Sequence, residues 1–513
     1  MHKGWQYIAL ILLFCLPVIA AVVASDYSML CSLVQRDGDP ALAEMAVQEA
    51  GQFERILGPY SRFGWNHPGP LVYYLLWPFY ALVQCSIGLQ ISAFVVKILI
   101  LTISGALLIR LPRTSAFLLL FCLQLLLLLD PVMFRSYSTG PYMFSNLFNT
   151  WNPVLSWFCY LGLISFSLSY LFRNRERNII AATIFASLCI QTNMGLSAQA
   201  ALTILSAYII RNRNTKYFGA TSPWTWMAVL LALLSMIPIF AEMLLTNANN
   251  LELIVKHIRS PYPSAGLMEA LHILLIKIYM IPVGLLELGT PITVSAENQS
   301  ILLLPIFCAE IGLSIYMLLG RFSEPPVFKE ALTLILVLLA SGLFLIARFP
   351  TPVFDYSIEW ISVLGIFWHA LLGQMALRRM IHWKNHGLLD GFLNAALCVL
   401  LLIVVVKSGA RFGNDLREMV NRMQVQSTSH FHFQKIRSAL GAEDKSIHFL
   451  VPYPESGMDP LTYTGIIYRL QLAGFEPCVA PTMKFFFGYK IRKRNGCSVI
   501  LNPNGFTRLH RAR

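Results

Sequence analysis

The sequence predicts an all-α polytopic membrane domain of about eleven transmembrane helices, followed by a small C-terminal α/β domain. The chain has 513 residues, of which 56% are hydrophobic and only 13% are charged, whereas about a quarter of the residues of a typical soluble protein are charged. Apolar runs of about 20 residues recur along most of the chain, and this length crosses the hydrocarbon core of a bilayer. The net charge of +13 does not indicate nucleic-acid binding, because the basic residues stand in short loops between apolar runs.

Thirteen segments are candidates for membrane spans. We expect eleven of them to cross: 5–24, 89–109, 115–130, 153–172, 178–192, 198–210, 223–245, 299–320, 328–347, 357–377 and 388–407. The first run, Trp5 to Ala24, follows Lys3. Its apolar stretch is long and its basic flank is weak, which favours an uncleaved first span over a signal peptide.

Clusters of Lys and Arg set the predicted topology, because basic residues are enriched in cytoplasmic loops. The clusters placed in the cytoplasm are Lys3, Arg110 with Arg113, Arg173 to Arg177, Arg211 with Arg213 and Lys216, and Arg378 with Arg379 and Lys384. The N-terminus is then cytoplasmic and residues 26–66 lie outside. With eleven crossings, we expect a multi-pass protein whose C-terminus is extracytoplasmic, in a plasma membrane such as a bacterial inner membrane.

Two apolar segments are expected not to cross. Segment 69–86 is rich in aromatic residues and is broken by two prolines, which suits a helix lying flat at the outer surface. Segment 265–287 carries Glu269, His272 and Lys277, and such side chains are costly in lipid. We therefore interpret it as a re-entrant or surface-lying helix.

The chain changes character near residue 409. We divide it into a transmembrane domain (1–408) and a soluble extracytoplasmic α/β domain (409–513). In the second domain we predict strands at 446–452, 475–480 and 497–501, and an amphipathic helix at 460–473 that Gly474 caps. An oxidising compartment permits a bridge between Cys478 and Cys497, but the sequence does not decide whether the two are close enough.

The first outer loop, 26–68, is the most informative segment for function. A loop of this length between spans exceeds the usual connection, and such loops are often functional. Asp37 and Asp39 are spaced as D-x-D. Asp39 precedes Pro40, so one interpretation is a helix cap followed by proline in the first turn. The other is a carboxylate at the membrane face that deprotonates an acceptor hydroxyl.

Arg62 and His67 stand between this loop and the membrane. An arginine can hold a phosphate through its planar fork of donors. His67 precedes a Pro-Gly-Pro turn, where it either takes part in the site or anchors the chain at the headgroups.

The order of a first span, an acidic outer loop and a His-Pro turn that runs into an aromatic stretch resembles the GT-C superfamily of membrane glycosyltransferases. It is similar to the branch, called glycosyltransferase family 39-like, that includes protein O-mannosyltransferases and the lipid A aminoarabinose transferase. Three later segments support the resemblance: Thr150 to Pro153 at the start of a span, Gln191 to Gly195 at an outer turn, and Glu242 shortly before Asn249 to Leu251.

The resemblance implies that a hexose or pentose on a polyprenyl phosphate is moved to an extracytoplasmic glycan, lipid or protein. Asp39, or else Asp37, is then the base, and Arg62 and His67 hold the lipid phosphate. Gln191, Asn193 and Glu242 are further candidates for substrate binding. Asn193 departs from the family pattern, in which we expect histidine, and this weakens the case for a second polar catalytic group there.

Other functions remain open. A transporter or flippase of lipid-linked sugars is the alternative, but such a protein should carry internal repeats and charges near mid-membrane, and neither stands out. A non-catalytic assembly protein is a third interpretation. No cofactor is indicated, and a divalent metal requirement is left open. His430 and His432 are interpreted as surface residues on a strand, because two ligands do not make a metal site.

Overall fold

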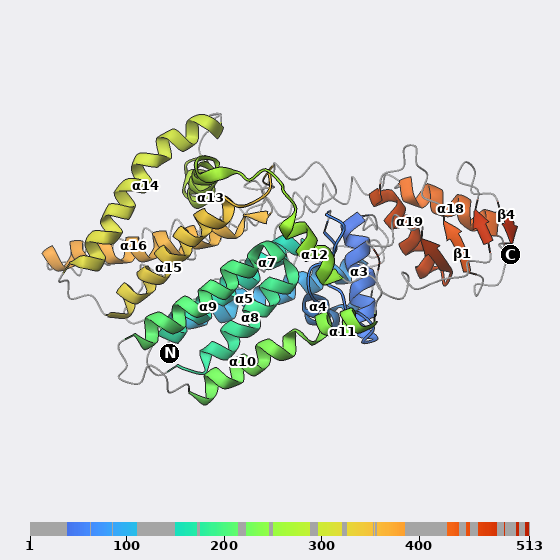
Figure 1. Ribbon diagram of the computed structural model, residues 1–513, viewed down its shortest axis with the longest axis horizontal. Helices are drawn as coiled ribbons and strands as arrows, with labels where there is room; N and C mark the ends of the chain where they lie inside the picture. The colour runs from blue at the N-terminus through green and yellow to red at the C-terminus, as the bar shows by residue number, and fades with distance from the viewer. Residues whose placement is uncertain are drawn as a thin grey trace, which may run out of the picture.

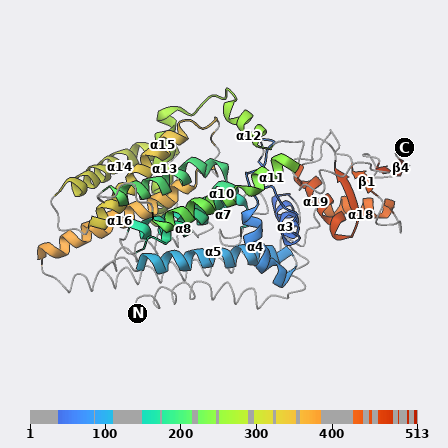
Figure 2. The same cartoon turned by 60° about the horizontal axis from the view of Figure 1, so that its bottom comes forward.

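The structure is a computed structural model. It describes residues 38–61, 63–84, 86–109, 149–171, 175–213, 222–245, 250–287, 296–320, 326–351, 353, 357–384, 428–440, 448–451, 460–479, 487, 499–501 and 508–511. The helices of the membrane part lie side by side in an elongated bundle, and a C-terminal α/β segment (the described residues of 428–511) lies beyond one end of it (Figures 1 and 2). The predicted spans 5–24, 115–130 and 388–407 fall outside the described residues.

The membrane part is helical throughout its described regular structure. Its helices are α3 (Gly38–Gly51), α4 (Leu71–Val83), α5 (Ser86–Ile109), α7 (Asn152–Leu171), α8 (Asn178–Thr192), the 3₁₀ turn η2 (Met194–Leu196), α9 (Ser197–Asn212), α10 (Pro223–Ser235), α11 (Ile237–Leu245), α12 (Asn250–Arg259), α13 (Gly266–Glu287), α14 (Ala296–Leu319), α15 (Pro326–Ile346) and α16 (Trp360–Lys384).

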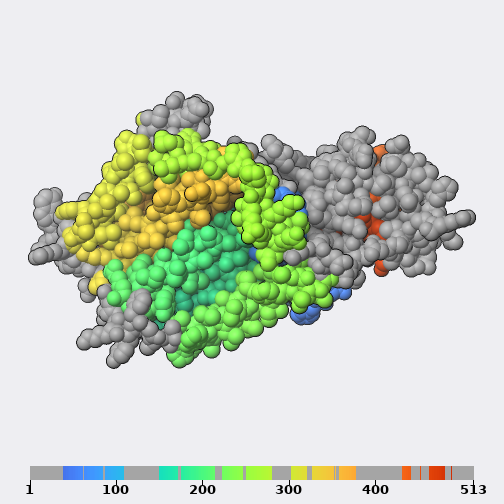
Figure 3. All heavy atoms as spheres, in the orientation of Figure 1, coloured from blue at the N-terminus to red at the C-terminus, as the bar shows by residue number. Residues whose placement is uncertain are grey.

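Within these residues, 6 helical segments are long and apolar enough to cross a membrane. They are 87–108, 152–171, 194–212, 223–245, 302–319 and 326–346, and each corresponds to a predicted span. Segment 223–245 is divided into α10 and α11 at Met236, because Pro238 follows two residues later and lacks the N–H that a continuous helix needs. Helix α10 lies along one rim of the bundle (Figure 3), and several of its apolar side chains are exposed, among them Trp226, Leu230 and Leu233.

The prediction that α13 is re-entrant or surface-lying concerns its place in the membrane and stays a prediction. The helix packs against α14, α15 and α16, so it lies within the bundle. The charge that argued against this place is neutralised, because Lys277 forms a buried ion pair with Glu359. A buried ion is tolerated when a partner of opposite charge accompanies it.

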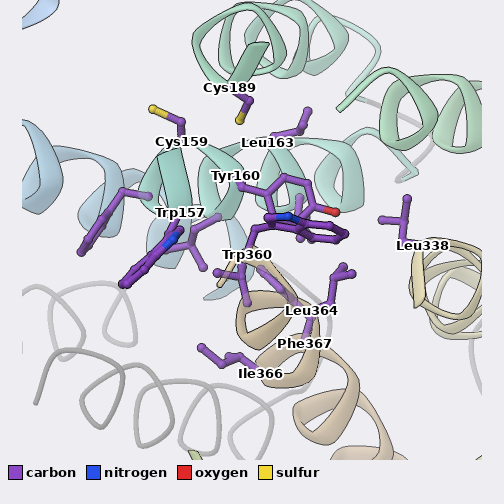
Figure 4. Close-up of a cluster of buried hydrophobic side chains, with 14 of the residues drawn as sticks. Trp157, Cys159, Tyr160, Leu163, Cys189, Leu338, Trp360, Leu364, Ile366 and Phe367 are labelled. Atoms are coloured by element: carbon purple, nitrogen blue, oxygen red, sulfur yellow. The ribbon is translucent and has the colours of Figure 1, made fainter. Parts of the chain in front are cut away.

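The core of the membrane part lies between α7 and α16. Trp360, at the start of α16, meets the ring of Tyr160 edge to face at 5.8 Å, and both residues are fully buried. Trp157, Leu364 and Phe367 extend this cluster along the two helices (Figure 4). The aromatic packing fixes α7 beside α16, although the two are about 200 residues apart in the chain.

The C-terminal α/β segment contains a sheet with strand order β2-β1-β3-β4. Strand β1 (His448–Val451) is parallel to β2 (Glu476–Val479) and to β3 (Val499–Leu501), and β3 is antiparallel to β4 (Arg508–Arg511). Helix α19 (Pro460–Leu472) connects β1 to β2 and ends at Gly474, whose φ of +83° suits glycine. Three strands and the helix thus lie where the sequence predicted them.

Two features of this segment were not predicted. Helix α18 (Thr428–Leu440) carries His430 and His432, so the expectation of a strand there is wrong. Cys478 in β2 is disulfide-bonded, but its partner and Cys497 lie outside the described residues, so the bridge between those two cysteines stays a prediction.

Helix α3 joins the two parts. Ala46, Val47 and Ala50 on one face belong to the core of the membrane part. Ala41, Leu42 and Met45 belong to the core of the C-terminal segment. The two sets are offset by five residues, or about 140° around a helix of 3.6 residues per turn, so α3 is buried from two sides.

Candidate active site

A hairpin, residues 58–67, lies at the centre of the candidate site. The Gly58 N–H donates to the His67 carbonyl at 3.1 Å, and the His67 N–H donates to the Pro59 carbonyl at 2.7 Å. Tyr60 and Asn66 pair as an antiparallel bridge. The chain reverses at Gly64, whose φ of +84° an L side chain rarely adopts. Because the hairpin is fixed by its own backbone, its side chains point in defined directions.

Asp39 lies in the first turn of α3. The helix begins at Gly38, so Asp39 stands just inside the helix and not before it, and a carboxylate is favoured there by the helix dipole. The Tyr60 hydroxyl of the hairpin donates a hydrogen bond to Asp39 Oδ1. Asp39 is half-buried and lies within electrostatic range of Tyr73 on α4. The structure thus aims Asp39 at the hairpin.

Arg55 bonds to the backbone that leads into the hairpin. Its guanidinium donates to the Leu57 carbonyl at 2.7 Å and to the Gly58 carbonyl at 3.0 Å. It also pairs with Glu49 at 3.0 Å and lies 5.2 Å from the centre of the Tyr73 ring. Sequence reasoning missed this residue, because a lone arginine in a loop carries no motif.

His67 is buried at the end of the hairpin. The Met194 N–H donates to His67 Nδ1 at 2.9 Å, so the proton of the neutral ring is on Nε2. Burial lowers the pKa of His67 to about 3, and the ring is therefore uncharged at neutral pH. Its Nε2 makes no hydrogen bond to a described residue.

Trp65 lies beside His67 on the same side of the hairpin, since residues two apart on an extended strand share a face. The ring centroids are 5.1 Å apart and the rings meet edge to face. The Trp65 indole N–H is buried and has no hydrogen-bond partner among the described residues. Two neighbouring rings, those of Trp65 and His67, thus each carry a neutral N–H donor.

Gln191 and Asn193 connect the end of α8 to its surroundings. The Gln191 side chain accepts from the Leu71 N–H at 3.3 Å and donates to the Ser235 carbonyl at 2.7 Å. The Asn193 side chain accepts from the Gly195 N–H at 3.0 Å. Both are buried, and Gly69 lies so close to Gln191 that an added Cβ would overlap its amide. Gln191 therefore holds the hairpin's exit against the bundle, whereas the Asn193 side chain bonds within its own turn and to Ser156.

Glu242 reaches the hairpin through Asn250. Its carboxylate accepts from the Asn250 N–H at 3.3 Å. The Asn250 side chain accepts from the Asn66 N–H and donates to the Asn66 carbonyl, both at 2.7 Å. This amide clasp (Asn250 with the backbone of Asn66) attaches α12 to the hairpin.

The structure thus gathers most of the predicted residues around one hairpin: Asp39, His67, Gln191, Asn193 and Glu242. Asp37 and Arg62 lie outside the described residues. Tyr60, Trp65, Asn66 and Asn250 were missed, although the aromatic richness of the loop was a signal for the first two. Across the part of the chain that is described, no group of three or more His, Cys, Asp or Glu side chains could hold a metal ion.

Two crystal structures are similar to this chain along most of its length. Both are of ArnT from Cupriavidus metallidurans. The apo structure has a TM-score of 0.47 and 13% sequence identity, and the match covers 93% of this chain and 86% of that one. The structure bound to undecaprenyl phosphate has a TM-score of 0.44 and 13% identity, with 92% and 87% covered. No family model and no curated protein matches the chain.

Proposed function

We propose that this protein is a membrane glycosyltransferase that moves a sugar from a polyprenyl-phosphate donor to a hydroxyl outside the cytoplasm. The observation that carries the proposal is the arrangement around the hairpin. A carboxylate, Asp39, lies at one side of the hairpin, and two buried neutral donors, Trp65 and His67, lie on its strand.

Asp39 supplies the base. Its carboxylate accepts the proton of the acceptor hydroxyl, and the acceptor oxygen then bonds to the anomeric carbon of the sugar. The bond between that carbon and the phosphate oxygen breaks, and its electron pair stays on the phosphate. Because both faces of α3 are buried, the helix holds Asp39 in position before the reaction. No further entropy is then lost in ordering the base when the proton is transferred.

Trp65 and His67 supply donors for a phosphate oxygen. Because His67 is neutral, its contribution is a directed hydrogen bond from Nε2 and not a full positive charge. Donors that are already oriented in a buried site favour charge that develops on the leaving phosphate. Arg62, which the sequence assigns to the same loop, is the cation expected to complete the binding of the phosphate.

In this proposal the reaction takes place on the extracytoplasmic side of the membrane. Helix α3 belongs to the first outer loop and packs on the C-terminal segment. The two parts must therefore lie on the same side of the membrane. If the first loop is outside, as the basic loops predict, the C-terminal segment is extracytoplasmic too.

The substitution Asp39→Asn tests the proposal. It keeps the size of the side chain and removes the base, so we expect a folded protein in which transfer falls by about 100- to 10,000-fold. Transfer is measured as release of polyprenyl phosphate from the polyprenyl-phosphate-sugar fraction of host membranes. Glu54→Gln, at an exposed carboxylate beyond the end of α3, is the matched control and should keep normal activity.

Two results would count against the proposal in different ways. Normal transfer by Asp39→Asn together with loss in Asp37→Asn would move the base to Asp37. Transfer by the double variant at the normal rate would reject a loop carboxylate as base and with it the proposed mechanism.

A further inference from the structure

The helix that carries Asp39 is part of two cores. Its outward face contributes Ala41, Leu42 and Met45, which are 1%, 7% and 6% exposed. They pack in one cluster with side chains of α18, α19 and the sheet, among them Ile436, Tyr463, Ile466, Val479 and Phe487. Because these α3 residues lie within two turns of Asp39, the C-terminal segment is in contact with the first part of the helix.

The partner of Asp39 is in contact with the same cluster. Tyr60 donates its hydroxyl hydrogen bond to Asp39, and its ring packs against the C-terminal core. The hairpin fixes the backbone of Tyr60 through its bridge to Asn66, but a side chain on a hairpin needs packing to hold its rotamer. The C-terminal core supplies that packing.

We propose that the C-terminal α/β segment is a positioning element for the active site: by docking on α3 and on Tyr60, it holds the hydrogen bond between Tyr60 and Asp39. Tyr60 is then a positioning residue and Asp39 the catalytic one. This inference rests on the proposed function for the role of Asp39. Among the described titratable groups, Tyr60 of the hairpin donates to Asp39, and Tyr73 of α4 lies within electrostatic range of Asp39. Arg55 and Glu49 lie within electrostatic range of the same Tyr73.

The chemistry predicts a signature in the pH profile. A hydrogen bond donated to a carboxylate favours its ionised form. Removing the donor makes the base easier to protonate, so activity is lost at a higher pH on the acid side. For Tyr60→Phe we expect the acid limb of kcat to move upward by about one pH unit, which is a tenfold change in the ionised fraction on that limb.

Leu42→Ala tests the role of the docking. Leu42 touches the C-terminal core and belongs to neither the base nor its hydrogen bond. Truncation leaves a gap between α3 and the C-terminal segment, so the acid limb should move in the same direction as in Tyr60→Phe, and Leu42→Met should restore it. In the double variant of Tyr60→Phe and Leu42→Ala, the limb should lie no higher than in Tyr60→Phe alone, because both changes act on one hydrogen bond.

Val47→Ala is the matched control. Val47 lies on the same helix, but it faces the core of the membrane part, so its truncation should lower stability and leave the acid limb in place. A wild-type pH profile in Leu42→Ala, with a shifted one in Tyr60→Phe, would overturn the positioning role of the C-terminal segment. Equal shifts in Leu42→Ala and Val47→Ala would overturn it as well. Normal transfer by the double variant of Asp37→Asn and Asp39→Asn would instead reject the proposed function, so the two failures are distinguishable.

Discussion

The amide clasp between Asn250 and Asn66 should contribute strongly to the stability of the protein. Asn66 has no exposed surface, and its N–H and C=O both bond to the Asn250 side chain at 2.7 Å. Asn250→Ala removes both partners. Each buried backbone group left without a partner costs ~1–3 kcal/mol, so the variant should lose ~2–6 kcal/mol.

The measurement is the thermal unfolding midpoint in detergent, followed as the fraction of protein that stays monodisperse after heating. In a domain of 150–250 residues each kcal/mol shifts the midpoint by about 2–4 °C, and the expected decrease is at least several degrees. Transfer activity should fall too, because Asn66 precedes His67 in the hairpin.

Asn212→Ala is the matched control for this experiment. The Asn212 side chain also donates to a carbonyl, that of Tyr208 at 2.9 Å, but it lies near a helix end where water can replace it. The control should keep the wild-type midpoint to within about 1 °C. Equal midpoints for Asn250→Ala and Asn212→Ala would refute the reasoning, since the Asn66 backbone groups would then have other partners.

Two further predictions concern buried charge. Lys277→Met or Glu359→Leu alone should destabilise the protein by ~3–5 kcal/mol, because each leaves one buried charge unpaired. The double variant should recover most of this loss. Losses that simply add in the double variant, measured by thermal unfolding of all four proteins, would contradict this. The pKa of His67 is depressed to about 3, against an ordinary value of 6.5. Below pH 6.5 the unfolded chain therefore binds more protons than the folded one, and the free energy of unfolding falls as the pH drops from 6.5 toward 3. By pH 5 the loss is about 2 kcal/mol, and a His67→Gln variant whose midpoint fell equally between pH 7 and pH 5 would exclude His67 as the cause.

The long helices were predictable because the length and hydropathy of a span are local properties of the chain. Segments 89–109, 153–172 and 328–347 correspond closely to α5, α7 and α15. The packing of α13 was harder to predict for a non-local reason. The cost of Lys277 in lipid was estimated without its partner Glu359, which stands 82 residues later.

The candidate site was predictable in part. Asp39 and His67 were chosen from the loop motif, and the turn at Gln191 to Gly195 was expected to lie near them. The residues that were missed act through contacts between distant segments. Asn250 reaches Asn66 across 184 residues, and such a pairing leaves no periodicity or spacing in the sequence. His430 and His432 were assigned to a strand because a short alternating run cannot be told from one turn of a helix.

The double burial of α3 has a consequence for how the protein is made. Its membrane-facing residues can be covered soon after synthesis, because α4 and α5 follow directly in the chain. Leu42 and Met45 must wait for α18 and α19, which are completed roughly 400 to 430 residues later. At a synthesis rate of about 5–20 residues per second, these apolar side chains stay uncovered for tens of seconds. Any chaperone that attends this stage would have to shield the first outer loop, and a chain that stops before α18 would leave that face of α3 exposed.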